Sequence, residues 1–235
     1  MLILLLPILA SVLVFITNQR YIRQEIIRTN ETQLDLTQQT IDKRFDELQR
    51  LGQQLSLNSR LARFATIRGE IRPSHRMNLY FLTQDMVGYS AANDFIDELF
   101  VYFEGTDSVV GPSKHLQDEL FYRLYIGPAG MSEATWQSLT SQQHYANLIN
   151  VDENPDSRQL LYLHNIEQVG TGSRQIFLSL VDKNEFTWAT RHSPDPDTSV
   201  TLLILGADDE VLVRQGLLEP TEEELQTLLQ HLNLV

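Results

Sequence analysis

The chain contains no cysteine among its 235 residues. Disulfide frameworks, zinc ribbons, thiolate nucleophiles and thiol redox chemistry are therefore excluded, and any site must use oxygen and imidazole groups. Basic residues are also few, because 18 Lys and Arg stand against 31 Asp and Glu, for a formal net charge of −13. Since binding to a phosphate backbone needs a basic face, we expect no direct nucleic-acid contact by this segment.

Common catalytic and nucleotide-binding motifs are also missing from the sequence. There is no Gly-x-Ser-x-Gly elbow and no Walker run, and the six histidines show no HExxH or other paired spacing. Gly170-Thr171-Gly172 lacks the third glycine of a nucleotide loop and predicts a hairpin turn. We therefore expect a protein that is not an enzyme and that holds no metal ion or other cofactor. A membrane-tethered hydrolase has no supporting feature.

An uncharged run from Leu2 to Thr17 begins the chain. At ~1.5 Å per residue it reaches about 24 Å, somewhat short of the ~30 Å hydrocarbon core. We predict a transmembrane segment over residues 1–18, since no basic residue precedes the run and no small-x-small site comes after it, as a cleaved signal peptide would require. Arg20, Arg23 and Arg28 favour a cytoplasmic position for the residues after the run. On these grounds alone the orientation stays open.

Residues 19–72 differ in composition from the rest of the chain. Residues 18–72 carry ten Lys and Arg against seven Asp and Glu and no proline, whereas residues 73–235 carry eight against 24. We predict a stalk helix over 19–72, followed by a globular body. Its apolar positions recur every seven residues, at Ile27, Leu34, Ile41, Leu48, Leu55 and Ala62.

The row four residues further on is mostly polar, so only half of a coiled-coil seam is apolar; its members are Glu31, Gln38, Phe45, Gly52 and Ser59. A strong coiled coil is therefore not expected. Either the apolar row packs on the chain's own globular domain, or it forms a weak parallel homodimer that carries a signal toward the membrane. Both arrangements can occur in one protein, at different points along the helix.

The body, residues 73–192, alternates strand-like runs with helical stretches. After a helix over residues 76–88, a hairpin is expected, then a helical crossing at Leu116–Ile126 whose leucines repeat at helical spacing, and a helix capped by Ser132. We predict an α+β fold, a PAS-like antiparallel sheet of five strands with helices packed on one face. The expected strands are Leu99–Phe103, Ser108–Gly111, Tyr145–Val151, Gln159–Ile166 and Gln175–Val181.

Residues 193–235 begin a second unit. The Pro/Asp linker Ser193–Thr198 precedes two expected strands, Val200–Leu205 and Glu210–Arg214. Thr221 and Glu224 then form a capping-box pattern for a helix that reaches about Leu232. We expect a truncated, membrane-proximal second PAS-like unit and a natural protein that is longer.

Three stretches carry a resemblance to a known family. They are Gln54–Leu61 at the end of the stalk, Phe95–Phe103 with Asp107 and Val109-Val110-Gly111, and Ala134–Leu139 around Trp136. With the membrane segment, the chain resembles the extracytoplasmic Cache-like, PAS-related sensor region of membrane-anchored AraC-family transcriptional regulators from Gram-positive bacteria. The resemblance implies that residues after about 18 are extracytoplasmic and that a second span and a helix-turn-helix domain lie beyond residue 235.

In the same family, amino-acid-binding members carry an Arg-x-Trp-Tyr type cluster. The nearest run here, Phe121–Tyr125, has no tryptophan. Sensor histidine kinases share similar front ends, so the input domain of such a kinase is an alternative.

Six residues are candidate ligand contacts: Tyr102, Tyr122, Trp136, Tyr162, His164 and Asp182. Strand alternation puts Tyr162 and His164 on one face; if that face meets the helices, both join the other aromatics around a mixed aromatic and polar pocket. The alternative is that these are core or surface aromatics with satisfied polar tips. Asp182 either binds a ligand amine or caps a turn together with Glu185.

These features lead to one functional expectation. The protein is a non-enzymatic, membrane-anchored extracytoplasmic sensor that binds a small molecule or an extracellular solute-binding protein, and its N-terminal helix transmits the change. A membrane-tethered protein-interaction module without a sensing role is the remaining alternative.

Overall fold

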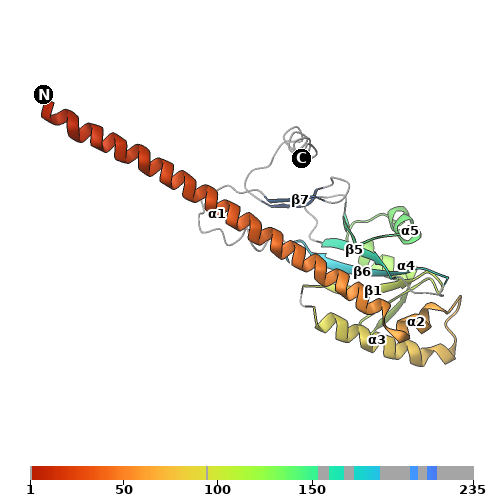
Figure 1. Ribbon diagram of the computed structural model, residues 1–235. Coiled ribbons are helices and arrows are strands. Elements are labelled where there is room, and N and C mark those ends of the chain that lie inside the picture. Colours follow the sequence, from red (N-terminus) through yellow and green to blue (C-terminus); the bar gives the residue numbers. More distant parts are fainter. Residues whose placement is uncertain are drawn as a thin grey trace.

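The computed structural model describes residues 2–93, 95–152, 159–166, 172–185, 202–205 and 211–215. Figure 1 shows one very long helix, α1, that lies along a body built from a sheet and several shorter helices. Within α1, the side chains of residues 2–13, 16, 30 and 33 lie outside this description.

Helix α1 (Leu2–Ser56) has 55 residues, a length of about 82 Å at 1.5 Å per residue. Only its C-terminal part packs on the body: Leu48 and Leu55 are fully buried, whereas Ile27 and Leu34 are 51% and 55% exposed. The apolar row thus packs on the chain's own domain at its lower end, as one of the two alternatives predicts. A stalk homodimer through the upper end stays a prediction.

The predicted transmembrane segment 1–18 forms the first turns of α1. Its side chains up to residue 13 lie outside the described part of the chain. Among the residues that the structure describes, no helix is long and apolar enough to cross a membrane.

The helix predicted for 19–72 is interrupted at Asn58. Asn58 is extended (φ −73°, ψ 112°), and its side-chain oxygen accepts the N–H groups of Arg60 and Leu61 at 2.8 and 3.0 Å. Asn58 therefore caps a new helix, α2 (Ser59–Ala65), because its side chain satisfies two otherwise unpaired N–H groups. A loop and the 3₁₀ turn η1 (Pro73–His75) come next, then α3 (Arg76–Ala91), near the bounds predicted for it.

The main sheet has six antiparallel strands in the order β3-β2-β1-β6-β5-β4. All five predicted strands are present, with small shifts of their ends. The prediction of five strands was wrong because it missed the edge strand β3. The strands are β1 (Glu98–Phe103), β2 (Ser108–Gly111), β3 (Lys114–Gln117), β4 (Asn147–Asn150), β5 (Gln159–Asn165) and β6 (Gln175–Asp182).

Strand β3 occupies the start of the stretch predicted as a helical crossing. A tight turn with Ser113 at φ +56° pairs Gly111 with Lys114, so the chain folds back as a hairpin before any helix begins. Helix α4 (Asp118–Phe121) and the π-helical turn η2 (Tyr122–Ile126) come after it. A π turn holds more residues than an α turn, and it rotates the buried face. Phe121 and Ile126 are buried, whereas the predicted row residues Leu120 and Leu124 are 43% and 55% exposed.

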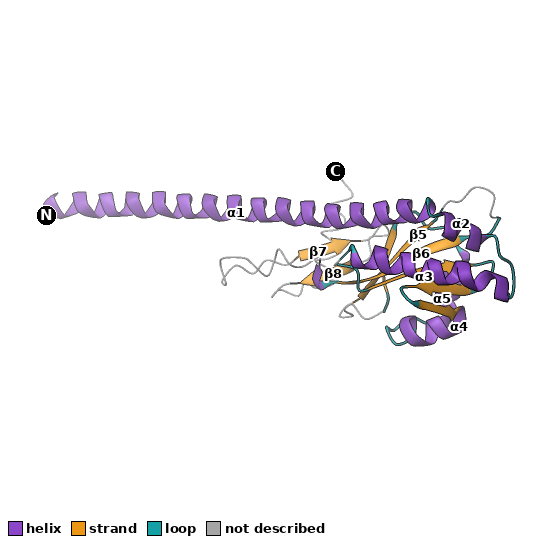
Figure 2. Cartoon of the chain, turned by 90° about the horizontal axis from the view of Figure 1, so that it is seen from below, coloured by secondary structure: helices purple, strands orange, loops and turns teal. Residues whose placement is uncertain are grey.

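Helices cover both faces of the sheet, so the prediction of helices on one face was wrong. Figure 2 shows α1 and α2 on one side and α4 and α5 (Glu133–Ser141) on the other. Strand β1 explains the difference, because all residues from Leu99 to Phe103 are buried. Its odd positions, such as Val101, face a core shared with α1, α2 and α3, and its even positions, such as Phe100, face a second core under α4 and α5. Ser132 caps α5 as predicted, by accepting the N–H of Thr135.

Strands β7 (Leu202–Leu205) and β8 (Val211–Gln215) form a separate two-stranded antiparallel sheet. Both lie where strands were predicted. Leu212 and Val213 are buried in the same core as Leu48 of α1. The linker at 193–198 and the helix expected at 221–232 lie outside the described residues, and a second PAS-like unit stays a prediction.

Candidate functional site

The six predicted site residues do not lie on one face of the sheet. Tyr102 and Trp136 belong to the core under α4 and α5, and Tyr122 packs against it. Tyr162, in contrast, belongs to the core under α1. The alternation in β5 was predicted correctly, but its even face meets α1 and its odd face meets α5. The prediction of a single pocket that joins both sets is therefore wrong.

Tyr162 and His164 form part of the contact between α1 and the sheet. Tyr162 is fully buried, and its ring stacks on that of His164 with centroids 6.4 Å apart. A Cβ added to Gly52 of α1 would lie 2.8 Å from His164 Cδ2, so the helix backbone approaches this ring as closely as a glycine permits. Within the described residues, the Tyr162 hydroxyl and the Ser179 Oγ are buried without a hydrogen-bond partner.

Asp182 ends β6, at the edge of the body. Its Oδ1 accepts the N–H of Asn184 at 2.8 Å, which is the bond expected of a cap. Burial and the neighbouring charges of Asp182 and Glu185 raise the pKa of Asp97. The contact supports the capping interpretation of Asp182; binding of a ligand amine stays a prediction.

On the face away from α1, four side chains form what we call the Tyr102–Trp136 cluster: Tyr102, Asp107, Asp118 and Trp136. The Tyr102 hydroxyl donates to Asp107 Oδ1 at 3.2 Å, and the indole N–H of Trp136 donates to Asp118 Oδ1 at 3.0 Å. The backbone N–H of Asp118 donates to the carbonyl of Asp107 at 3.1 Å. The cluster thus joins a strand, a hairpin turn and two helices.

Local structure fixes each member of the cluster. Tyr102 is an even position of β1, and Asp107 occupies the hairpin turn with φ +47°, a conformation that Asp tolerates better than most residues. Asp118 is the first residue of α4, where a carboxylate is favoured by the helix dipole. Trp136 lies in the first turns of α5 and is 1% exposed.

The cluster is acidic and partly desolvated. Burial raises the pKa of Asp118; the Trp136 N–H lowers it, and the neighbouring charges of Asp107 and Glu133 raise it. Burial also raises the pKa of Tyr102, and the charges of Asp107 and Asp118 raise it further. Tyr102 is therefore a neutral hydrogen-bond donor at neutral pH, and the cluster repels anions.

Aromatic side chains surround the cluster. Phe121 lies 5.6 Å from Trp136 and stacks on Tyr125 at 5.3 Å between ring centroids. The Tyr122 hydroxyl donates to the carbonyl of Met131 at 3.0 Å. The hydrogen bonds from Tyr102 and Trp136 both end on an Oδ1 atom, one on each carboxylate.

Sequence reasoning missed two of the four members as site residues. Asp107 was named only in the stretch that carries the family resemblance, and Asp118 was not singled out. Asp118 lies 18 residues before Trp136, so no spacing rule relates them. The position of Asp118 at the start of a helix was the one available signal, and it is obscured because β3 replaces the expected first turn of that helix.

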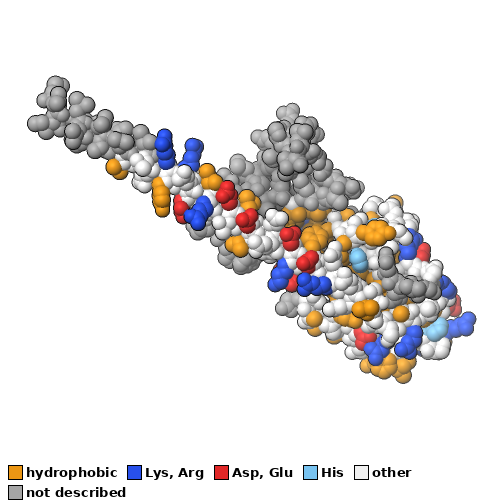
Figure 3. Space-filling view, in the orientation of Figure 1, with side chains coloured by type: hydrophobic (Ala, Val, Ile, Leu, Met, Phe, Trp, Pro, Cys, Tyr) orange, Lys and Arg blue, Asp and Glu red, His pale blue; other side chains and the backbone are white. Residues whose placement is uncertain are grey.

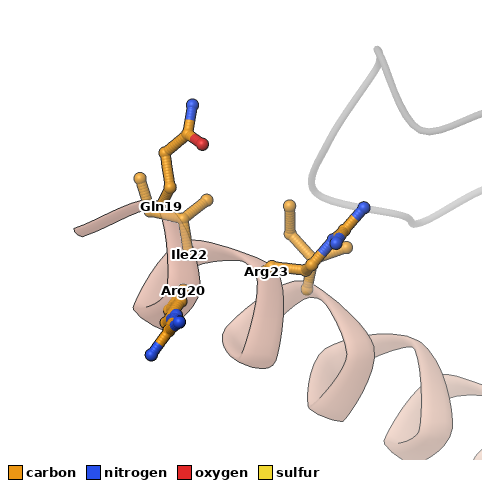
Figure 4. Close-up of a pocket in the computed structure, with 5 residues that line it drawn as sticks. Gln19, Arg20, Ile22 and Arg23 are labelled. Carbon is orange, nitrogen blue, oxygen red and sulfur yellow. The ribbon is translucent and has the colours of Figure 1, made fainter. Parts of the chain in front are cut away.

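A pocket of about 570 Å³ lies away from the cluster, along the upper part of α1 (Figure 4). Gln19, Arg20, Ile22, Arg23 and Ile26 line it, and none of them is a predicted site residue. Among the described residues, no group of three or more His, Asp or Glu side chains is placed to hold a metal ion. No family model, curated protein or solved structure matches the chain.

Proposed function

We propose that the chain is the extracytoplasmic sensing region of a membrane-anchored regulator, that a small ligand binds at the Tyr102–Trp136 cluster, and that α1 transmits the change. One observation carries the proposal: the cluster and the long helix pack on opposite faces of the same sheet. A change at the cluster is thus separated from α1 only by the thickness of the sheet.

Strand β1 connects the two faces directly. Tyr102 belongs to the cluster, and its neighbour Phe103 packs edge-on against Phe64 of α2 at 4.8 Å between centroids. A ligand that binds two arrangements of β1 with different affinity would shift the population of the helix positions. Without such a difference in affinity, binding would leave α1 unchanged.

The order of elements supports a PAS-like sensor. The strands β1 and β2, a helical crossing through α4 and α5, and the strands β4, β5 and β6 occur in the order that the sequence pattern predicts for a PAS-like sheet, with β3 as an added edge strand. In this proposal the output of the regulator is an AraC-type DNA-binding domain. The input domain of a histidine kinase would have the same front end.

The chemistry of the cluster favours a particular kind of ligand. Two carboxylates and a neutral phenol lie beside aromatic rings; Tyr102 and Trp136 are buried, Asp118 is partly exposed and Asp107 is exposed. Such a site suits a small neutral or cationic molecule that donates hydrogen bonds and has an apolar face. A solute-binding protein would need a larger exposed surface.

Thermal unfolding of the full chain with a library of sugars, amino acids and carboxylates tests the proposal. A ligand at 100 times its Kd stabilises the folded state by about 2.7 kcal/mol. We expect a shift in Tm for neutral or cationic compounds that is lost in Asp107→Asn and Asp118→Asn. Asp46→Asn, on the exposed side of α1, should retain it.

Two results would argue against this site. A shift that both site variants retain would place the ligand elsewhere. No shift with any compound, for a well-folded parent, would favour recognition of a protein partner. Because the chain has no cysteine, spin labels on single cysteines in α1 and α5 would report whether ligand moves the helix.

A further inference from the structure

The outer face of α3 carries an exposed apolar stripe. Met77, Tyr80, Phe81 and Val87 are 65%, 57%, 43% and 37% exposed. Their spacing of three, four and seven residues puts them on one side of the helix, opposite the buried Leu82. Figure 3 shows hydrophobic side chains gathered on the part of the body where Figure 1 places α3.

Gly88 extends this stripe. A Cβ at Gly88 would meet no heavy atom within 4 Å, so no described neighbour requires a glycine here. Glycine inside a helix lowers its stability relative to alanine. The glycine therefore lowers the stability of the helix relative to alanine and leaves a shallow notch in the exposed surface.

We propose that two copies of the chain pair through α3, with the two helices antiparallel and a two-fold axis passing at Gln84. Gln84 is exposed at the centre of the stripe. In a two-fold interface, residues equally far before and after the centre meet. Phe81 then meets the partner subunit's Val87, and Tyr80 meets the partner subunit's Gly88.

The stripe is self-complementary in shape under this symmetry. Its three largest residues, Met77, Tyr80 and Phe81, all precede Gln84, and the smaller Val87, Gly88 and Ala91 come after it. Each bulky half therefore faces a small half of the other copy. If the stripe bound an unrelated apolar partner, nothing would require its large and small residues to be separated at Gln84.

Charge supports the antiparallel direction. The N-terminal end of α3 has Arg72 and Arg76 and no acidic residue in its first turn, and the last turn has no basic residue. Within one helix this distribution opposes the macrodipole. In an antiparallel pair, Arg76 of each copy lies near the negative C-terminal end of the other helix, where a cation is favourable.

The arrangement is independent of both the ligand site and the stalk. Helix α3 belongs to the face of the sheet that meets α1, away from the Tyr102–Trp136 cluster. One pair of 16-residue helices provides an interface at the low end of the range for specific complexes. We therefore expect a weak, reversible dimer.

Disulfide crosslinking of a single introduced cysteine tests the pairing in the full chain, purified in mild detergent. Gln84→Cys places the only thiol on the two-fold axis, where it meets its own copy. At ~10 µM protein we expect crosslinking about 100-fold faster than for Gln137→Cys on the exposed side of α5, because a pair holds its thiols at an effective concentration on the order of mM.

A second variant separates pairing from folding. Gly88→Leu fills the notch and improves helix propensity, so it should not lower the Tm, yet it should reduce Gln84→Cys crosslinking to the level of Gln137→Cys. Equal crosslinking of the two cysteines, or rapid crosslinking that Gly88→Leu leaves unchanged, would overturn the proposal. If the stripe instead contacts a lipid surface or another protein, the two cysteines should crosslink equally.

Discussion

The indole N–H of Trp136 donates a hydrogen bond to Asp118 Oδ1 at 3.0 Å, and this bond ties α5 to the first residue of α4. The ring is 1% exposed, and the carboxylate is half-buried. Charge-assisted bonds of this kind are shorter and stronger than neutral ones. The pair therefore holds the two helices of this face together, and it influences the protonation of the acid at the centre of the cluster.

Trp136→Phe should destabilise the fold by about 1.5–3 kcal/mol, because it removes the donor to a half-buried carboxylate. It should also raise the pKa of Asp118 further, since the Trp136 bond lowers it. Urea unfolding and a carboxyl ¹³C titration measure the two effects. A double-mutant cycle with Asp118→Asn provides the control: purely additive losses would contradict a direct coupling.

Gly52→Ala and Gly88→Ala should have opposite effects on stability. At Gly52 the new Cβ would lie 2.8 Å from His164, so the gain in helix propensity is outweighed by overpacking, for a net loss of up to about 2 kcal/mol. At Gly88 the Cβ enters open space, and a gain of about 0.5–1 kcal/mol is expected. Thermal unfolding at low protein concentration compares them. Equal gains would show that α1 does not rest on His164.

Asn58→Ala should cost about 1–2 kcal/mol, because α2 loses the oxygen that caps it. Asn58→Ser retains a capping oxygen but loses the amide bond to Asp85, so its loss should stay below about 1 kcal/mol. Chemical denaturation separates the two contributions. Equal losses would mean that the link to α3, rather than the cap, stabilises this corner.

Glu104 should make stability depend on acid pH. Its bonds to the side chain and backbone N–H of Arg174 lower the pKa of Glu104 below its usual 4.5. A lowered folded-state pKa means that stability is fully present above the unfolded pKa and is lost as pH falls through the folded value. Glu104→Gln should therefore destabilise by up to about 1 kcal/mol at pH 7, because the pair is partly exposed, and by less below about pH 4.

Unfolding curves from about pH 2 to 7 measure this difference. Glu70→Gln, in the exposed loop before α3, serves as the control for removal of a carboxylate elsewhere on the surface. Asp97 and Asp118 act with the opposite sign, since their raised pKa values favour the folded state as pH falls. A Glu104→Gln profile parallel to the parent's would exclude the Arg174 bonds as its source.

Much of the fold could be predicted from local pattern, and the failures have identifiable physical causes. Alternating and continuous apolar runs located all five predicted strands, and Ser132 marked the start of α5. The leucine spacing at 116–124 wrongly predicted that a helix begins at Leu116. Ser113 adopts a positive φ that folds the chain back into β3 first. Helical periodicity cannot detect a turn of that kind or the π turn after it.

The candidate site was predicted only in part for a different reason. Tyr102, Tyr122 and Trp136 were found because large aromatics with polar tips are recognisable in a sequence. Tyr162 was grouped with them because period-two alternation shows which residues share a face, but not which helix covers that face. That information comes from the packing of α1, which depends on contacts more than 100 residues apart in sequence, such as Gly52 against His164.

The part of α1 before its packed segment is long enough to act as a lever arm. The portion before Thr37, the first buried residue among those whose side chains the structure describes, spans about 52 Å at 1.5 Å per residue. If α1 tilts by about 5° about Thr37, Gly52 at the sheet moves by about 2 Å and the distal tip moves by about 4.5 Å. A displacement of α1 against the sheet is thereby magnified about twofold at the start of the chain.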